Sequence, residues 1–180
     1  MNEMSEIKPD RRLEKTRRSL GQAMFALLQT MDWDEISITE LCKTADVARS
    51  SFYAHFENKA DVLSHLITTQ VPHQAGTQNG KPLAVLDWLI NHVSENKTMF
   101  MKLNGSAGAG PVMQRFKLAI HARLKADLAL HGIITSDEKL AFIIGGTHEA
   151  LTFWARSWNA AELPKLKTFI LAQATSVLLT

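Results

Sequence analysis

Apolar residues recur at steps of three and four along most of the chain, which is the spacing of residues on one face of an α-helix. In the first such stretch, which ends near Thr30, the recurring residues are Leu13, Leu20, Met24, Leu27 and Leu28. A later stretch repeats Phe116, Ile120, Leu124 and Leu128 every four residues. The pattern predicts an all-α fold of about nine helices, each of which buries an apolar stripe.

The stretch from Ile36 to Leu63 predicts two short helices joined by a tight turn, then a brief loop and the start of another helix. Ser37 and Glu40 form a capping-box pattern at the first of these helices, and Asn58 can cap the helix that follows it. Asp46 stands where the chain must reverse, and Asp is one of the few residues besides Gly that tolerate left-handed backbone angles. This layout is typical of a helix-turn-helix that reads DNA.

The second helix of the motif, expected at about residues 48–56, separates its side chains by face. Ala48, Phe52 and Phe56 are expected to point inward, because they recur every four residues. The other side carries Arg49, Ser50, Ser51 and Tyr53. Arginine binds guanine edges or phosphates, serine hydroxyls bind either, and a tyrosine hydroxyl can bind phosphate while its ring packs on the sugar. A surface of this composition suits a DNA groove.

The run TELCKTADVARSSFYAHFENKADVL, residues 39–63, resembles the N-terminal domain of the TetR family of bacterial transcriptional regulators. The likeness lies in the order of its features: a helix, a turn ending in Val, small polar residues, an aromatic followed by Tyr, then His-Phe, and a Lys that opens the next helix. It covers about residues 11–70. The sequence departs from the family at Asp46, which stands where Gly is usual, and we expect a slightly strained turn there rather than a lost function.

The resemblance implies that nine residues contact DNA. Four would approach bases or adjacent phosphates: Thr39, Arg49, Ser50 and Ser51. Five would hold the DNA backbone: Thr16, Arg17, Tyr53, His55 and Lys59. The first two turns of the first helix carry a cluster of cations: Arg11, Arg12, Lys15, Arg17 and Arg18. The helix dipole does not stabilise positive charge at this end, so a contact with DNA phosphates is one explanation. The alternative is a solvated charged face. His55 can instead cap the end of its helix.

The chain is expected to form two domains. Residues 71–82, VPHQAGTQNGKP, predict a loop between a DNA-binding domain at residues 1–70 and an effector-binding and dimerisation domain at residues 71–180. The tract NGSAGAG at residues 104–110 interrupts the helical period and is interpreted as a mobile linker. The last two helices carry apolar residues on more than one side, which predicts a four-helix bundle with a second copy of the chain. The resemblance implies the same homodimer.

Members of the TetR family usually hold a small molecule in the helical C-terminal region, and the resemblance implies a small-molecule effector here. Aromatic and methionine side chains form adaptable apolar walls, and a histidine can anchor a polar group. On that basis the candidate lining residues are Trp88, His92, Met99, Phe100, Met113, Phe116, His121, His148 and Trp154. Each of them is also a candidate for ordinary core or surface.

Composition narrows the classes of function. The chain has 180 residues, of which 46% are hydrophobic, so it can bury a core. Its formal charge of +2 is too small to indicate nucleic-acid binding. Any evidence for such binding must come from a local cluster of basic and polar residues. The single cysteine, Cys42, excludes an intramolecular disulfide and a Cys-rich zinc site. No apolar run approaches the about 20 residues that a membrane span needs, so a cytoplasmic protein without cofactor or metal is expected.

These observations predict a sequence-specific DNA-binding regulator rather than an enzyme. The expected form is a homodimeric repressor that a small-molecule effector releases from a palindromic operator on double-stranded DNA. No nucleophile with a base, paired carboxylates, metal-ligand set or phosphate-binding loop appears at a credible spacing. The alternative is a small helical enzyme or ligand-binding protein that uses the helix-turn-helix only as an element of its fold. A regulator without any ligand is a third possibility.

Overall fold

The computed structural model describes residues 11–70, 81–157 and 159–179, and in these ranges it contains nine α-helices, three short 3-10 helices and no strand. The predicted all-α fold is confirmed. The chain divides into two compact units, Met1–Leu66 and Ile67–Thr180. The assignment of DNA binding to residues 1–70 and of effector binding and dimerisation to residues 71–180 stays a prediction. None of the helices in the described ranges is long and apolar enough to cross a membrane.

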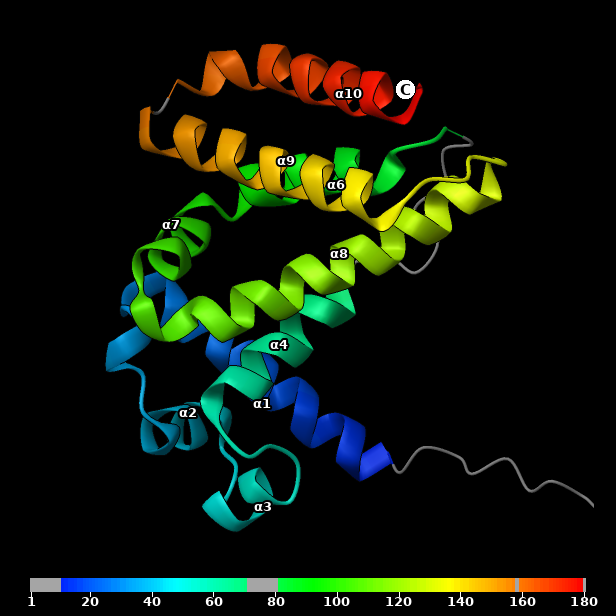
Figure 1. Ribbon diagram of the computed structural model, residues 1–180. Coiled ribbons are helices and arrows are strands. Elements are labelled where there is room, and N and C mark those ends of the chain that lie inside the picture. Colours follow the sequence, from blue (N-terminus) through cyan, green and yellow to red (C-terminus); the bar gives the residue numbers. More distant parts are fainter. Residues whose placement is uncertain (1–10, 71–80, 158, 180) are drawn as a thin grey trace, which may run out of the picture. The chain divides into compact units, whose positions relative to one another are not determined.

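The first unit is built on a short helix-turn-helix. Its elements are α1 (Arg11–Thr30), the 3-10 helix η1 (Trp33–Glu35), α2 (Ile38–Ala45), α3 (Arg49–Tyr53) and the start of α4 (Lys59–Gln70). Figure 1 shows α2 and α3 as two short helices joined by a turn. The core consists of large side chains that are almost completely buried: Leu20, Met24, Leu28, Trp33, Ile36, Leu41, Phe52 and Leu63.

Two predicted caps set the ends of these helices. The Ser37 hydroxyl accepts the Glu40 backbone N–H at 3.1 Å and so opens α2. The Asn58 side-chain oxygen accepts the Asp61 backbone N–H at 3.1 Å in the same way at the start of α4. Both bonds satisfy helix N–H groups that have no partner within the helix.

The turn after α2 is a Schellman motif with Asp46 at its left-handed position. Asp46 has φ 52° and ψ 47°, as expected from its place in the sequence. The Asp46 N–H donates to the Lys43 carbonyl at 3.2 Å, and the Val47 N–H donates to the Cys42 carbonyl at 3.0 Å. These two bonds satisfy carbonyls at the end of α2, so the turn keeps its usual hydrogen bonds although Asp stands in place of Gly.

The helix α3 is shorter than predicted. It ends at Tyr53, but a bond of 2.9 Å from the Phe56 N–H to the Phe52 carbonyl continues the turn beyond it. Phe52 and Phe56 are buried as expected, whereas the expectation that Ala48 points inward was wrong, because Ala48 is exposed. Ala48 precedes the helix in extended backbone, so the four-residue spacing does not apply to it.

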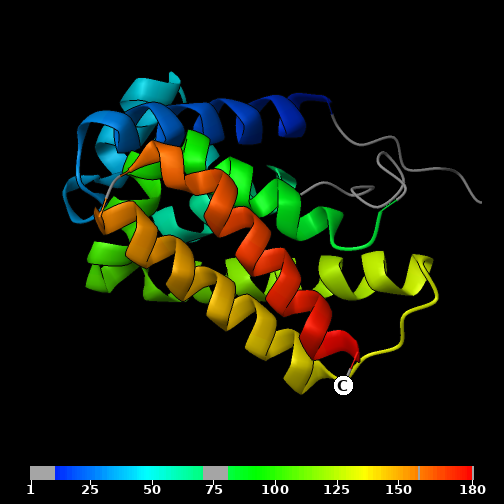
Figure 2. The same cartoon turned by 90° about the horizontal axis from the view of Figure 1, so that it is seen from above.

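The second unit consists of packed helices around an aliphatic core. Its α-helices are α6 (Ala84–Glu95), α7 (Lys97–Gly105), α8 (Gly110–Leu130), α9 (Asp137–Ser157) and α10 (Leu163–Leu179), with the 3-10 helices η2 (Ala107–Ala109) and η3 (Ala160–Glu162) between them. The helix α8 packs against α6, α7 and α9. The helices α9 and α10 run side by side in opposite directions (Figure 2).

The structure corrects one expectation for this unit. The tract at residues 104–110 is not a linker, because it ends α7, forms η2 and starts α8, with Ala109 completely buried. The helix α6 begins at Ala84, after Leu83 with its left-handed φ of 69°, so Pro82 lies before it. At the start of α9 the Ser136 hydroxyl accepts the Lys139 N–H at 3.4 Å. The predicted loop at residues 71–82 lies largely outside the described residues.

Replacing Asp46 with Gly should stabilise the protein by up to about 1 kcal/mol, because Gly adopts left-handed angles without the strain of an L-residue. Asp46→Asn is the matched control, since it removes only the charge that opposes the negative end of the helix dipole. Denaturant unfolding followed by circular dichroism measures the difference. A Gly variant that is no more stable than the Asn variant would contradict a strained turn.

Candidate nucleic-acid interface

The exposed side of α3 carries the polar residues that the sequence predicts for it. Phe52 is fully buried, while Tyr53 is 53% exposed and its neighbours Arg49, Ser50 and Ser51 are exposed as well. The Tyr53 ring lies edge-on against the Phe52 ring, with centroids 5.2 Å apart and an interplanar angle of 88°. The burial of Phe52 therefore determines which residues α3 presents to solvent, and these offer a guanidinium and three hydroxyls.

The other predicted DNA contacts differ in exposure. Thr39 is exposed on α2, whereas Thr16, Arg17 and His55 are half-buried. Burial is the main cause that lowers the pKa of His65 on α4, and the positive charge of Arg17 lowers it further. Arg17 thus acts electrostatically on α4 as well as contributing to the basic start of α1. Lys15 and Arg18 on α1 are exposed, and the side chains of Arg11 and Arg12 lie outside the described part of the chain.

Lys59 makes a set of contacts that sequence reasoning did not predict. Its ammonium donates to the Trp33 carbonyl at 2.6 Å and to the Ile36 carbonyl at 2.8 Å. The same nitrogen lies 4.6 Å from the centroid of the Trp33 ring, within the range of a cation–π interaction. Burial lowers the pKa of Lys59, and the carboxylate of Asp34 opposes that shift. No local signal reveals these contacts, because the partners are 23 and 26 residues away.

Cys42 on α2 is buried in the first unit. Burial raises the pKa of its thiol, and the charge of Arg49 opposes the shift. A buried thiol that stays protonated is a poor nucleophile and a poor metal ligand. Cys42 therefore acts as a small core residue.

Five of the nine candidate effector residues line one cavity in the second unit. They are His92, Met99, Phe100, Met113 and Phe116, and Asn96 lies among them. The cavity has a volume of about 30 Å³, which is close to the volume of one water molecule in the liquid. Trp88 stacks on His92 with ring centroids 4.7 Å apart. In this conformation the cavity around His92 therefore has no room for an organic ligand.

His148 borders a second small cavity that also touches Phe100 and Phe116. Its Nε2 lies 2.8 Å from the Asn104 side-chain oxygen, so a protonated Nε2 donates to that oxygen. Burial lowers the pKa of both His92 and His148, which keeps these imidazoles neutral near pH 7. The paired asparagine was not predicted, because it lies 44 residues away in the sequence.

The two remaining candidates lie elsewhere. His121 lies 3.6 Å from the exposed Asp137 carboxylate, which also binds Lys125. The Trp154 indole donates to the Asn159 carbonyl at 3.3 Å. Within the described ranges, no group of three His, Cys, Asp or Glu side chains is placed to hold a metal ion.

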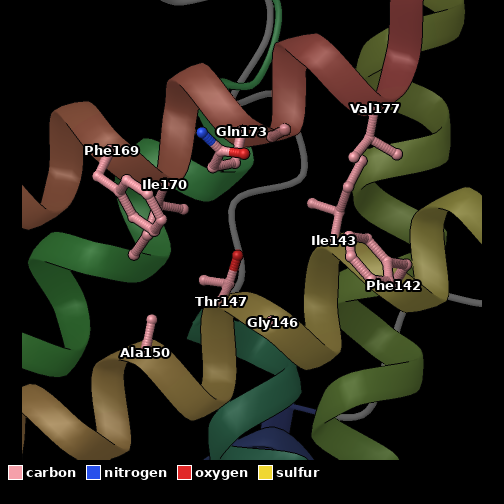
Figure 3. Close-up of a pocket in the computed structure, with 10 residues that line it drawn as sticks. Phe142, Ile143, Gly146, Thr147, Ala150, Phe169, Ile170, Gln173 and Val177 are labelled. Atoms are coloured by element: carbon pink, nitrogen blue, oxygen red, sulfur yellow. The ribbon is translucent and has the colours of Figure 1, made fainter. Parts of the chain in front are cut away.

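An apolar groove of about 240 Å³ runs between α9 and α10 (Figure 3). Phe142 and Phe169 at its rim are 69% and 58% exposed, and Gly146 lies on its floor. Phe153, further along α9, is 74% exposed. The two terminal helices thus keep a large apolar surface outside the core of the chain, as the sequence predicts.

Residues 22–66 match the model for the tetR family of bacterial regulatory proteins. The chain is also 28% identical over 91 residues to YxbF of Bacillus subtilis (strain 168), which is described as an uncharacterized HTH-type transcriptional regulator. That match covers 43% of this chain, and the chain spans about a quarter, 24%, of that relative's length.

Solved structures of TetR regulators share the fold over most of the chain. A TetR transcriptional regulator from Streptococcus agalactiae 2603V has a TM-score of 0.64 and 22% identity, with 92% of this chain and 96% of that chain covered. Thermus thermophilus FadR, a TetR family transcriptional repressor in complex with lauroyl-CoA, has a TM-score of 0.54 and 20% identity, with 91% and 93% covered. These proteins are regulators rather than enzymes. The helix-turn-helix unit of the chain therefore matches the tetR family of bacterial regulatory proteins, and the chain shares the fold of solved TetR regulators.

Proposed function

We propose that the protein is a sequence-specific DNA-binding regulator, in which Arg49, Ser50 and Ser51 of α3 read a major groove together with Thr39 of α2. The observation that carries this proposal is the division of α3 into a buried aromatic side and an exposed polar side. A helix with exposed arginine and serine can donate hydrogen bonds to base edges and phosphates. The exposed Tyr53 is assigned to the DNA backbone.

The half-buried members of the predicted set take supporting positions in this proposal. Thr16, Arg17 and His55 are assigned to the backbone beside the groove. Lys59 was predicted as a backbone contact by the same resemblance, but its ammonium already has two carbonyl partners within the protein.

The active form is proposed to be a homodimer built on α9 and α10. A monomer that exposes Phe142, Phe153 and Phe169 on two neighbouring helices leaves apolar surface in water, which a second copy would cover. Gly145 and Gly146 are exposed on α9 and would allow the partner helix to approach closely. A two-fold dimer reads a palindromic site, with its two reading helices about 34 to 36 Å apart or a multiple of one DNA turn.

The regulatory signal is proposed to be a small molecule that enters the second unit and releases a repressor from its operator. The aromatic and methionine walls around His92, with His148 nearby, support such a site. The bound lauroyl-CoA of FadR shows that a protein of this fold can hold a ligand. Because the cavity has room for about one water, effector binding would have to open it, and that opening links the ligand to a change of conformation.

The proposed function is tested by selecting the preferred duplex from random DNA and titrating the protein against it at several salt concentrations. We expect a palindromic site, and an affinity that falls by about 0.9 log units per log unit of salt for each phosphate neutralised. Fluorescence anisotropy measures both. Equal affinity for the selected duplex and for a scrambled duplex of the same length would overturn the proposal.

Replacing Arg49 with Ala should lower the affinity for the selected site more than the affinity for a scrambled duplex, with a loss of discrimination of about 1–3 kcal/mol for a base contact. Lys125→Ala is the matched control, because it removes the same charge from an exposed position in the second unit. Competition titrations measure the ratio of affinities. An equal loss on both duplexes would make Arg49 a phosphate contact.

Replacing Phe169 with Glu should dissociate the dimer, because the carboxylate would be buried in the apolar interface without a partner. Sedimentation should then report a mass near the 20.1 kDa of one chain instead of about twice that. Leu118→Glu is the control, since Leu118 is equally exposed but lies on α8 outside the groove. A wild-type protein that sediments as a monomer, or a Phe169 variant that remains a dimer, would contradict this interface.

A further inference from the structure

The ammonium of Lys59 is enclosed by groups that come from a single short segment, residues 33–36. This segment supplies two carbonyl oxygens at 2.6 and 2.8 Å, the face of the Trp33 ring at 4.6 Å, and the carboxylate of Asp34 as an electrostatic partner. All of these groups attract a cation. The Lys59 nitrogen therefore donates to two carbonyls of residues 33–36 and at the same time lies over the Trp33 ring.

The two carbonyls lie in a buried part of the chain. Trp33 and Ile36 are 2% and 1% exposed, so an unbonded carbonyl in this segment would be costly. The Trp33 carbonyl also accepts the Ile36 N–H at 3.3 Å. Ser37, the next residue, caps α2. The contact from Lys59 therefore fixes the backbone at the point where the chain enters the helix-turn-helix.

The other end of this contact is equally well fixed. Lys59 is the first residue of α4, whose start is capped by Asn58. The helix continues to Gln70, past the end of the first unit at Leu66. A side chain at the start of α4 thus holds the entrance of α2, across 23 to 26 residues of sequence.

We propose that Lys59 is a positioning residue for DNA recognition: it ties the start of α4 to the entrance of α2, and so sets the orientation of the reading helices instead of contacting a phosphate itself. This inference rests on the proposed DNA-binding function. It assigns to α4 the task of holding α2 and α3 in the position that fits the groove. It also predicts that the contact exists in the DNA-free protein.

The two possible roles of Lys59 differ in measurable ways. A phosphate contact would be absent without DNA, would contribute to binding of any duplex, and would tolerate arginine, which binds phosphates well. A positioning contact is present without DNA and favours the selected site. We expect it not to tolerate arginine, because the guanidinium is larger than an ammonium and holds its donors in one plane, whereas both carbonyls and the Trp33 ring surround a single nitrogen here.

The test compares Lys59→Met and Lys59→Arg with the wild-type protein, with Arg49→Met as the matched control. Methionine retains most of the length of the side chain but removes the charge and both hydrogen bonds. Amide hydrogen exchange in the DNA-free protein is measured first. We expect exchange at residues 33–41 to become about tenfold faster in Lys59→Met, because the entrance of α2 opens more often. Arg49→Met should leave exchange in this segment unchanged.

DNA binding is then measured on the selected and the scrambled duplex across a salt series. For Lys59→Met, affinity for the selected duplex should fall about tenfold or more, while affinity for the scrambled duplex and its salt slope should stay at the wild-type value, because no phosphate contact is lost. Lys59→Arg should show the same loss of discrimination although it keeps the charge. For a phosphate contact, the slope on both duplexes should fall by about 0.9 and arginine should restore it.

The outcomes separate this inference from the proposed function. Unchanged exchange at residues 33–41 in Lys59→Met, or full restoration of binding by Lys59→Arg, would overturn the positioning role while wild-type DNA recognition stands. A wild-type protein that does not distinguish the selected from the scrambled duplex would overturn the proposed function instead. If Lys59→Met fails to fold, the arginine variant alone decides, since it retains the cation and differs only in geometry.

Discussion

Burial of Phe52 determines how this chain presents a polar surface. The ring is completely buried in the first unit, and α3 is only five residues long, so its remaining residues have no other side to occupy. Arg49 and the two serines therefore face solvent, and the Tyr53 ring rests edge-on against Phe52. A short helix has little stability of its own, so its position depends on this burial and on the turn before it. The helix is held by the core, and its exposed side is available to a ligand.

Two polar residues, Asp46 and Lys59, also hold α2 and α3 in place, and each stands in a position that is locally unfavourable for it. Asp46 occupies a left-handed position that suits Gly better, yet it retains both hydrogen bonds of a Schellman turn. Lys59 is a cation whose pKa burial lowers, yet it satisfies two carbonyls that the 3-10 helix leaves near the core. The turn fixes α3 relative to α2, and the lysine fixes the entrance of α2 relative to α4. Together they set how α2, α3 and the start of α4 are arranged in the first unit.

Features that depend on neighbouring residues could be predicted from the sequence. The caps at Ser37 and Asn58, the left-handed Asp46 and the exposed residues of α3 follow from spacings of four residues or fewer. Features that depend on distant contacts could not. The carbonyl partners of Lys59 and the link between His148 and Asn104 join segments 23 to 44 residues apart, and the tract with Ala109 folds because its neighbours bury it. For the same reason His92 and Phe116 share a cavity, whereas His121 and Trp154 do not join them.

The measurement that tests the account most directly is an NMR titration of the ¹⁵N-labelled protein with its selected duplex. If the polar side of α3 reads DNA, the largest shifts of amide resonances should cluster at residues 37–59, and a scrambled duplex should leave residues 49–51 much less affected. The polar side of α3 would then be the recognition surface. Largest shifts outside residues 37–59, or identical shifts with both duplexes, would contradict the account.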